Sequence, residues 1–161
     1  MQGRTWLGAT AVILGTGGAA RATVVGCQQL GLQVVVVGRS EATLARLAAD
    51  FGVRTCLWDA KAAVLAAVDL CVNTTPIGMK DPDSSPLSPL ELALLPANAW
   101  VYDVIYVPRP TKLLRDAQAR GLTTEDGLQM LVVQGAAALK LWLEQADMPT
   151  EAMLAAAEAA L

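Results

Sequence analysis

The sequence contains no histidine, and this absence excludes several kinds of catalytic site. A Ser-His-Asp triad, a cysteine nucleophile activated by histidine and most zinc sites all require an imidazole ring. The three cysteines, Cys27, Cys56 and Cys71, are odd in number and far apart, and they form no Cys-x-x-Cys pair. We therefore expect reduced thiols in apolar surroundings and no metal site.

The chain also lacks a long apolar run and an excess of basic residues. Hydrophobic residues make up 54% of the 161 residues, but every apolar run stops well short of the roughly eighteen residues that a membrane span requires. The first residues do not have the layout of a signal peptide. A formal net charge of −3 provides no attraction for nucleic acid. We therefore expect a cytoplasmic protein without membrane or nucleic-acid partners, whose apolar surplus covers both faces of a sheet or supports self-association.

A glycine-rich motif follows the first apolar segment, Val12–Leu14. Its pattern, Gly15-x-Gly17-x-x-Ala20, is the spacing of a dinucleotide-binding turn between a strand and a helix. Gly15 permits the tight turn, Gly17 lets a pyrophosphate approach the backbone, and Ala20 keeps the helix close to the strand. The N–H groups and positive dipole at the helix start would hold the diphosphate. The alternative is an ordinary tight turn, because short glycine patterns also occur there.

A second apolar strand, Val34–Val37, follows about twenty residues later, which is the spacing of a βαβ unit. It ends in Gly38-Arg39-Ser40, where an NAD-specific domain usually carries Asp or Glu for the ribose 2′-hydroxyl. A guanidinium at this place can pair with a 2′-phosphate, so the sequence favours NADP over NAD. The alternative is a solvated arginine just after a strand.

Strands and helices alternate along the rest of the chain. This alternation, with strands that are apolar throughout, predicts an α/β fold with a three-layer, doubly wound parallel sheet, Rossmann-like, in the order 3-2-1-4-5-6. Residues 1–10 are interpreted as a leader or linker remnant, and residues 11–161 as one dinucleotide-binding domain. The expected strands are 12–14, 33–38, 53–57, 69–73, 100–106 and 122–124, and the expected helices are 18–30, 40–51, 60–67, 90–95, 111–120, 126–144 and 149–161.

The fourth predicted strand delivers a polar cluster, Asn73-Thr74-Thr75-Pro76, to its carboxyl end. Ligands in doubly wound sheets bind beyond the carboxyl ends of the strands, so this cluster is placed to face a cofactor. Plain turn chemistry is the alternative, since these residue types also serve turns.

Five stretches together resemble the NADP-binding domain of shikimate dehydrogenases, over nearly all of residues 11–161. They are Gly15–Arg21, Gly38–Ser40, Val72–Met79, Tyr102–Tyr106 and Asp126–Gly135.

The resemblance implies a set of cofactor contacts. The pyrophosphate would be wrapped by the glycine turn, the 2′-phosphate and adenosine held after the second strand, and the nicotinamide ribose and ring approached from three later segments. The pyrophosphate contacts would be Gly15, Thr16, Gly17, Gly18 and Ala19, and the 2′-phosphate and adenosine contacts would be Arg39 and Ser40. Asn73 and Thr75 would approach the nicotinamide ribose, and Val104, Gly127 and the backbone near Met130 would seat the nicotinamide ring.

The resemblance also implies substrate contacts. Tyr106 and Gln134 match residues that contact the carboxylate and a hydroxyl of shikimate. The alternatives are a strand-end tyrosine with its hydroxyl in water and a surface glutamine on a helix.

Two departures from the family pattern concern the nucleotide. Gly38 replaces a signature asparagine, and Thr43 stands where some relatives place a second basic residue, a role that Arg46 could take. Losing one charge-assisted contact costs on the order of 1.5–3 kcal/mol, so weakened NADP binding is expected.

A further departure concerns catalysis. Relatives carry a separate N-terminal domain that binds shikimate and supplies a Lys and Asp pair, and nothing in this sequence matches it. No catalytic residue is therefore assigned. The expected function is the cofactor half of an NADP-dependent shikimate dehydrogenase, which interconverts shikimate and 3-dehydroshikimate in aromatic amino acid biosynthesis, with little turnover alone. The alternatives are a stand-alone NADP-binding sensor or scaffold, and half of a quinate dehydrogenase.

Overall fold

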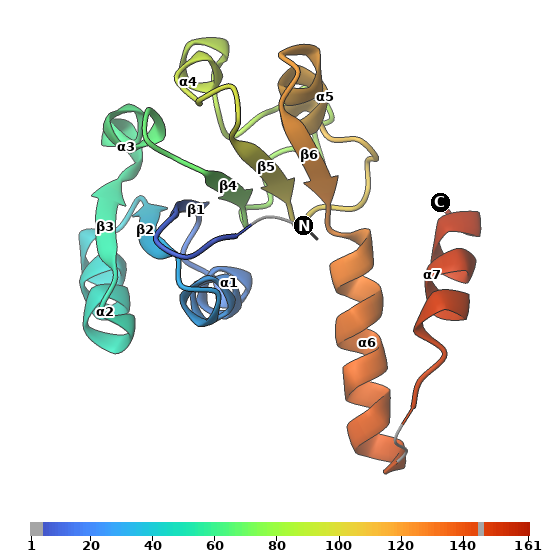
Figure 1. Ribbon diagram of the computed structural model, residues 1–161. Coiled ribbons are helices and arrows are strands. Elements are labelled where there is room, and N and C mark those ends of the chain that lie inside the picture. The colour runs from blue at the N-terminus through green and yellow to red at the C-terminus, as the bar shows by residue number, and fades with distance from the viewer. Residues whose placement is uncertain (1–4, 145–146) are drawn as a thin grey trace.

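A six-stranded parallel sheet forms the centre of the computed structural model, which describes residues 5–144 and 147–161 (Figure 1). Its strand order is β3-β2-β1-β4-β5-β6, so the predicted order and the doubly wound fold are confirmed. The order reverses beside β1, which places the carboxyl ends of β1 and β4 next to each other. The strands are β1 Thr10–Leu14, β2 Gln33–Gly38, β3 Arg54–Leu57, β4 Leu70–Asn73, β5 Trp100–Asp103 and β6 Thr123–Asp126.

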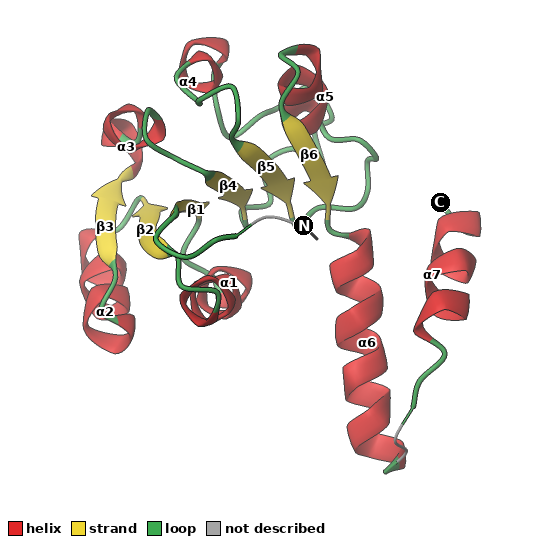
Figure 2. Ribbon diagram, in the orientation of Figure 1, coloured by secondary structure: helices red, strands yellow, loops and turns green. Residues whose placement is uncertain are grey.

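Helices cover both faces of this sheet (Figure 2). The helices α1 and α2 lie on one face, and α3, α4 and α5 lie on the other. A 3₁₀ turn, η1, joins β3 to α3, and two helices follow β6 at the end of the chain. The bounds are α1 Gly18–Gln29, α2 Glu41–Phe51, η1 Trp58–Ala60, α3 Ala62–Leu65, α4 Pro89–Ala93, α5 Lys112–Ala119, α6 Leu128–Leu143 and α7 Thr150–Ala159.

The sheet separates two apolar cores, because successive side chains of a strand point to opposite faces. In β1, Val12 and Leu14 enter the core beneath α3 to α5, whereas Ile13 enters the core beneath α1 and α2. All three side chains are fully buried. Burial on both sides explains why the central strands are apolar at every position rather than at alternate positions.

Local sequence signals mark the start of two helices and the end of one of them. Ser40 caps α2, since its hydroxyl accepts a hydrogen bond from the Thr43 N–H at 3.3 Å, and Gly52 closes the helix with a φ of 65°. Ser88 and Glu91 form a reciprocal capping box at the start of α4.

Several predicted elements have different bounds in the structure. The strand expected over 100–106 ends at Asp103, because the Asp103 carboxylate accepts the Ile105 N–H at 3.1 Å and turns the chain. The helix expected over 60–67 is divided into η1 and α3, and the edge strand lies at Thr123–Asp126 rather than 122–124.

The helix α6 extends away from the sheet and packs mainly against α7 (Figure 1). The apolar side chains of α6 recur at helical spacing in a stripe that includes Leu128, Val132 and Trp142. Leu128 and Val132 are buried near the start of the helix, but Trp142 is 77% exposed. At the other end of the chain, the Trp6 ring packs edge-on against Trp100, with ring centroids 5.7 Å apart. Among the described residues, no helix is long and apolar enough to cross a membrane.

Candidate dinucleotide site

The turn between β1 and α1 is closed on one side and open on the other. Gly15 has a φ of 115°, and a Cβ there would lie 2.6 Å from the Thr74 hydroxyl oxygen. A Cβ on Gly17 or Gly18 would meet no atom within 4 Å. Gly17 is the N-cap of α1 and has no side chain, so the N-cap residue does not cap the first N–H groups of α1. This open cradle at a helix N-terminus fits a diphosphate.

A cleft of about 450 Å³ runs from this turn to the end of β2. It is lined by residues 15–17, by Gly38 and Arg39, by Trp58 and by residues 74–77. Arg39 is exposed, and the carboxyl ends of β1 and β2 lie side by side, so its guanidinium can reach an anion in the cleft. The residues present therefore fit a dinucleotide that carries an additional phosphate.

Gly38 lies in close contact with the turn itself. A Cβ at residue 38 would lie 2.5 Å from the Thr16 methyl carbon and 3.1 Å from the Leu44 side chain. Thr16 thus occupies part of the space that an asparagine side chain at position 38 would need.

A buried polar network fixes the loop after β4. Asn73 is fully buried, and its amide donates to Asp103 at 2.9 Å and to the Ile77 carbonyl at 3.3 Å. Its oxygen accepts from the Thr75 N–H at 3.0 Å and hydroxyl at 2.7 Å. Asn73 therefore lies beneath the cleft and orients Thr75, which lines it. Any influence of Asn73 on a ligand would act through Thr75.

Asp103 is the acceptor at the centre of this network. Its carboxylate also accepts from the Thr111 hydroxyl at 2.8 Å, and Thr111 in turn caps α5. Burial raises the pKa of Asp103 to about 6, despite hydrogen bonds from Thr111, Ile105 and Asn73 that lower it.

This shifted pKa predicts a pH dependence of stability. Between the ordinary pKa of 3.8 and about 6, folded Asp103 holds a proton that the unfolded chain releases, so its contribution to stability falls as pH rises through that window. Asp103→Asn stays neutral and removes this fall. We expect the free energy of unfolding of the unmodified chain, relative to the variant, to drop by on the order of 2 kcal/mol from pH 4 to pH 7 in urea titrations.

Asp116→Asn is the matched control for this measurement, because Asp116 is partly exposed and pairs with Lys112 one turn away. Its urea profile should run parallel to that of the unmodified chain. Parallel profiles for Asp103→Asn as well would contradict the assignment.

A second cleft, of about 510 Å³, adjoins the first at Thr74–Pro76 and extends to Val104 and Tyr106. Gly127 lies against Val104, one of the residues that line this cleft, because a Cβ on Gly127 would lie 2.0 Å from the Val104 carbonyl oxygen. The structure thus brings Val104 and Gly127 together, with Tyr106 close by. Met130 instead lines a groove between α1 and α6, and Gln134 is an exposed side chain of α6 that lines neither cleft.

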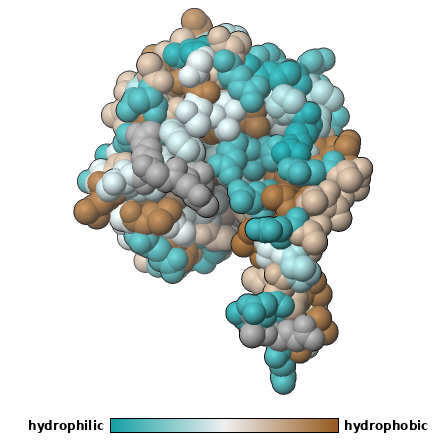
Figure 3. Space-filling view, turned by 45° about the vertical axis from the view of Figure 1, so that its right-hand side comes forward, coloured by the Kyte–Doolittle hydropathy of each residue, from teal (hydrophilic) through white to brown (hydrophobic). Residues whose placement is uncertain are grey.

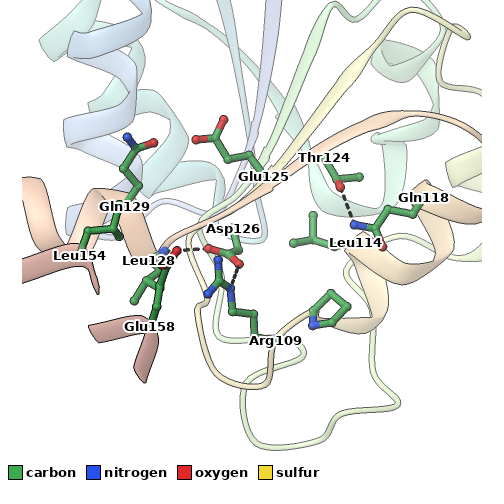
Figure 4. Close-up of a pocket in the computed structure, with 11 residues that line it drawn as sticks. Arg109, Leu114, Gln118, Thr124, Glu125, Asp126, Leu128, Gln129, Leu154 and Glu158 are labelled. Carbon is green, nitrogen blue, oxygen red and sulfur yellow. Dashed lines mark hydrogen bonds and ion pairs between the residues drawn. The ribbon is translucent and has the colours of Figure 1, made fainter. Parts of the chain in front are cut away.

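A separate hollow of about 330 Å³ lies between β6, α5 and α7 (Figure 4). In it Arg109 pairs with Asp126, and Glu158 of α7 points toward this pair. Because its cation is already paired and further carboxylates line it, this hollow does not suit a phosphate.

Comparison with known proteins agrees with this geometry. Residues 127–158 match the family model of the shikimate 5′-dehydrogenase C-terminal domain. The shikimate dehydrogenase (NADP(+)) of Synechocystis sp. is 50% identical over 157 residues, which are 92% of this chain and 54% of that protein. That of Thermosynechococcus vestitus is 48% identical, covering 99% of this chain and 57% of its own.

Solved structures give the same result. The shikimate 5-dehydrogenase of Thermus thermophilus, in complex with NADP(H) and shikimate, superposes with a TM-score of 0.81 at 36% identity, over 94% of this chain and 55% of that one. The quinate dehydrogenase of Corynebacterium glutamicum, in complex with NAD, gives a TM-score of 0.85 at 27% identity, over 95% and 55%. This chain spans about half the length of these relatives. By sequence and by fold, the chain therefore corresponds to the C-terminal domain of shikimate dehydrogenases.

Proposed function

We propose that residues 11–161 form the NADP-binding half of a cytoplasmic, NADP-dependent shikimate dehydrogenase of aromatic amino acid biosynthesis. The observation that carries this proposal is the continuous cleft from the open glycine turn to Arg39, which matches a diphosphate at one end and a 2′-phosphate at the other. Bound NADP⁺ would supply the nicotinamide that accepts a hydride from the carbinol carbon of shikimate, while the hydroxyl proton leaves to a base.

The chain's own residues would bind and orient rather than move this proton. The α1 N-terminus would hold the diphosphate, Thr75 would approach the nicotinamide ribose, and the Val104–Gly127 contact would form the seat of the ring. In this proposal Tyr106 and Gln134 contact the substrate, and Gln134 reaches it only where the other half of the enzyme completes the cleft.

Two of the four lysines, Lys61 and Lys112, do not offer a base at this site. The ammonium of Lys61 is 2.7 Å from Glu91 and that of Lys112 is 2.7 Å from Asp116, so both are engaged in ion pairs. We therefore propose that the proton acceptor belongs to the half of the enzyme that this chain does not span. Separating the two halves removes the large contribution of orientation to the rate.

The apolar groove between α1 and α6 supports this division. The groove has a volume of about 610 Å³ and is lined by Trp6, Leu30, Met130 and Val133, among others. In Figure 3 the far end of α6 projects below the rest of the molecule and has hydrophobic side chains along one edge. We propose that the relatives' additional half covers this groove, and that the isolated chain self-associates through it. A clean monomer in sedimentation at high concentration would argue against this self-association.

Two measurements on the purified chain test the proposed function. Calorimetric titration should give clear binding of NADP⁺ that is tighter than binding of NAD⁺. A steady-state assay with shikimate and NADP⁺ should give little or no turnover. Turnover close to that of a full-length relative would refute the division of labour, and heat with NAD⁺ but none with NADP⁺ would refute the cofactor assignment.

The likeness to quinate dehydrogenase favours quinate as a second candidate substrate for the same half. Shikimate and quinate differ too little for the residues on this side of the cleft to separate them. A stand-alone NADP-binding sensor or scaffold remains the alternative from another class. Tight NADP⁺ binding without a complementary catalytic domain in the source genome would favour the sensor.

A further inference from the structure

An aromatic side chain stands at the end of β3, beside the proposed cofactor cleft. Trp58 is half-buried and opens the turn η1. It lines the cleft together with Gly15 and Arg39, and it also lines an adjoining hollow of about 710 Å³ with Arg39 and Glu41. Trp58 therefore lies between the cleft and the adjoining hollow, and Arg39 lines both of them as well.

The Trp58 ring is held in place from one side. The Lys61 ammonium lies over the ring, 4.8 Å from its centroid, and Lys61 is only 7% exposed. The same ammonium pairs with Glu91, whose carboxylate also accepts from Ser88 in the capping box of α4. This anchored cation holds one face of the ring, and the side chain also packs against the core while it lines the cleft.

The charges along the cleft orient a nucleotide. The α1 N-terminus and Arg39 attract phosphates, whereas Glu41 and Asp59 line the adjoining hollow and repel them. A ligand with phosphates at one end and an uncharged heterocycle at the other therefore enters with its phosphates toward the glycine turn. Its base then reaches Trp58, and nucleic-acid bases stack well on aromatic rings.

We propose that Trp58 is the stacking partner of the adenine ring, and hence the residue that positions the adenosine end of the cofactor. This assignment rests on the proposed function. Because NAD and NADP share the adenine ring, Trp58 sets the affinity for both. Arg39, by contrast, sets the difference between them through the 2′-phosphate.

Two substitutions separate the aromatic face from the packing role of Trp58. Trp58→Leu keeps an apolar side chain against the core but removes the ring. In calorimetry it weakens the binding of NADP⁺ and of NAD⁺ about tenfold each. Trp58→Phe keeps a ring and binds both within about threefold of the unmodified chain. NADP⁺ also quenches the tryptophan emission of the unmodified chain, and Trp58→Phe loses most of this quench although Trp6, Trp100 and Trp142 remain.

Trp142→Leu is the matched control, because Trp142 is 77% exposed on α6, and its affinities and quench stay unchanged. A folded Trp58→Leu variant that binds both nucleotides within twofold overturns the assignment. A loss of NADP⁺ binding with unchanged NAD⁺ binding also overturns the assignment, because Trp58 would then act on the 2′-phosphate and not on the adenine ring. If Trp58→Leu fails to fold, the fluorescence of Trp58→Phe decides. A quench by NADP⁺ as large as that of the unmodified chain then overturns the assignment. If the unmodified chain binds neither nucleotide, the proposed function itself fails.

Discussion

Arg39→Gln is expected to weaken binding of 2′,5′-ADP about 10- to 100-fold and to leave binding of 5′-AMP unchanged. The guanidinium would make charge-assisted hydrogen bonds to the 2′-phosphate, and such contacts contribute roughly 1.5–3 kcal/mol. Arg39 is exposed and lines both the cleft and the adjoining hollow, so its replacement should not disturb folding. Calorimetric titration of the two nucleotides measures the effect directly.

Arg54→Gln is the matched control, since Arg54 is also exposed but begins β3, where it pairs with Val35, and it lines neither the cleft nor the adjoining hollow. It should bind both nucleotides as the unmodified chain does. An equal loss in the Arg54 and Arg39 variants would indicate a general charge effect and no defined phosphate site. An equal loss of 5′-AMP and 2′,5′-ADP in Arg39→Gln would place Arg39 on another part of the nucleotide.

Gly127→Ala is expected to lower the free energy of unfolding by about 3 kcal/mol, which corresponds to roughly 6–12 °C in Tm. The added methyl would lie 2.0 Å from the Val104 carbonyl oxygen and 2.5 Å from its carbon. Val104 cannot easily yield, because its N–H donates to the Asn73 carbonyl at 3.0 Å. The φ of residue 127 is −79°, so the penalty comes from space and not from backbone conformation.

Gly26→Ala provides the comparison for thermal denaturation of Gly127→Ala. Gly26 lies within α1, and a Cβ there would meet no atom within 4 Å, so alanine should raise stability slightly through helix propensity. If Gly127→Ala were as stable as Gly26→Ala, the close approach of α6 to Val104 would be wrong.

The parts of the fold that sequence analysis predicted are those whose signals are local. The glycine turn needs a positive φ at Gly15, and the start of α2 needs only the Ser40 hydroxyl and an N–H three residues later. The strand order followed from the alternation of elements and from the rule for right-handed crossovers. These features can be predicted from neighbouring residues and from general rules of chain connection.

The parts that differed depend on partners far apart in the sequence. Ile105 continues the apolar pattern of β5, but the strand ends because Asp103 turns toward Asn73 and Thr111. The same network buries Asn73, which sequence analysis had expected to approach the ribose. The methyl of Thr16 against Gly38 is likewise a contact across two neighbouring strands.

Two aromatic side chains show the same limit. Trp58 comes nineteen positions after Arg39, and only the parallel pairing of β2 with β3 puts them around one hollow. An aromatic residue just past the third strand was the available signal. Trp142 continues the helical stripe of α6, but periodicity does not tell whether the partner of that stripe lies in the same chain.

A crystal structure of this chain grown with NADP⁺ tests the central claim most directly. The account predicts diphosphate density within hydrogen-bond distance of the N–H groups at the start of α1, and 2′-phosphate density against Arg39. Density for the nucleotide in another hollow, or in this cleft with the 2′-phosphate directed away from Arg39, would contradict it.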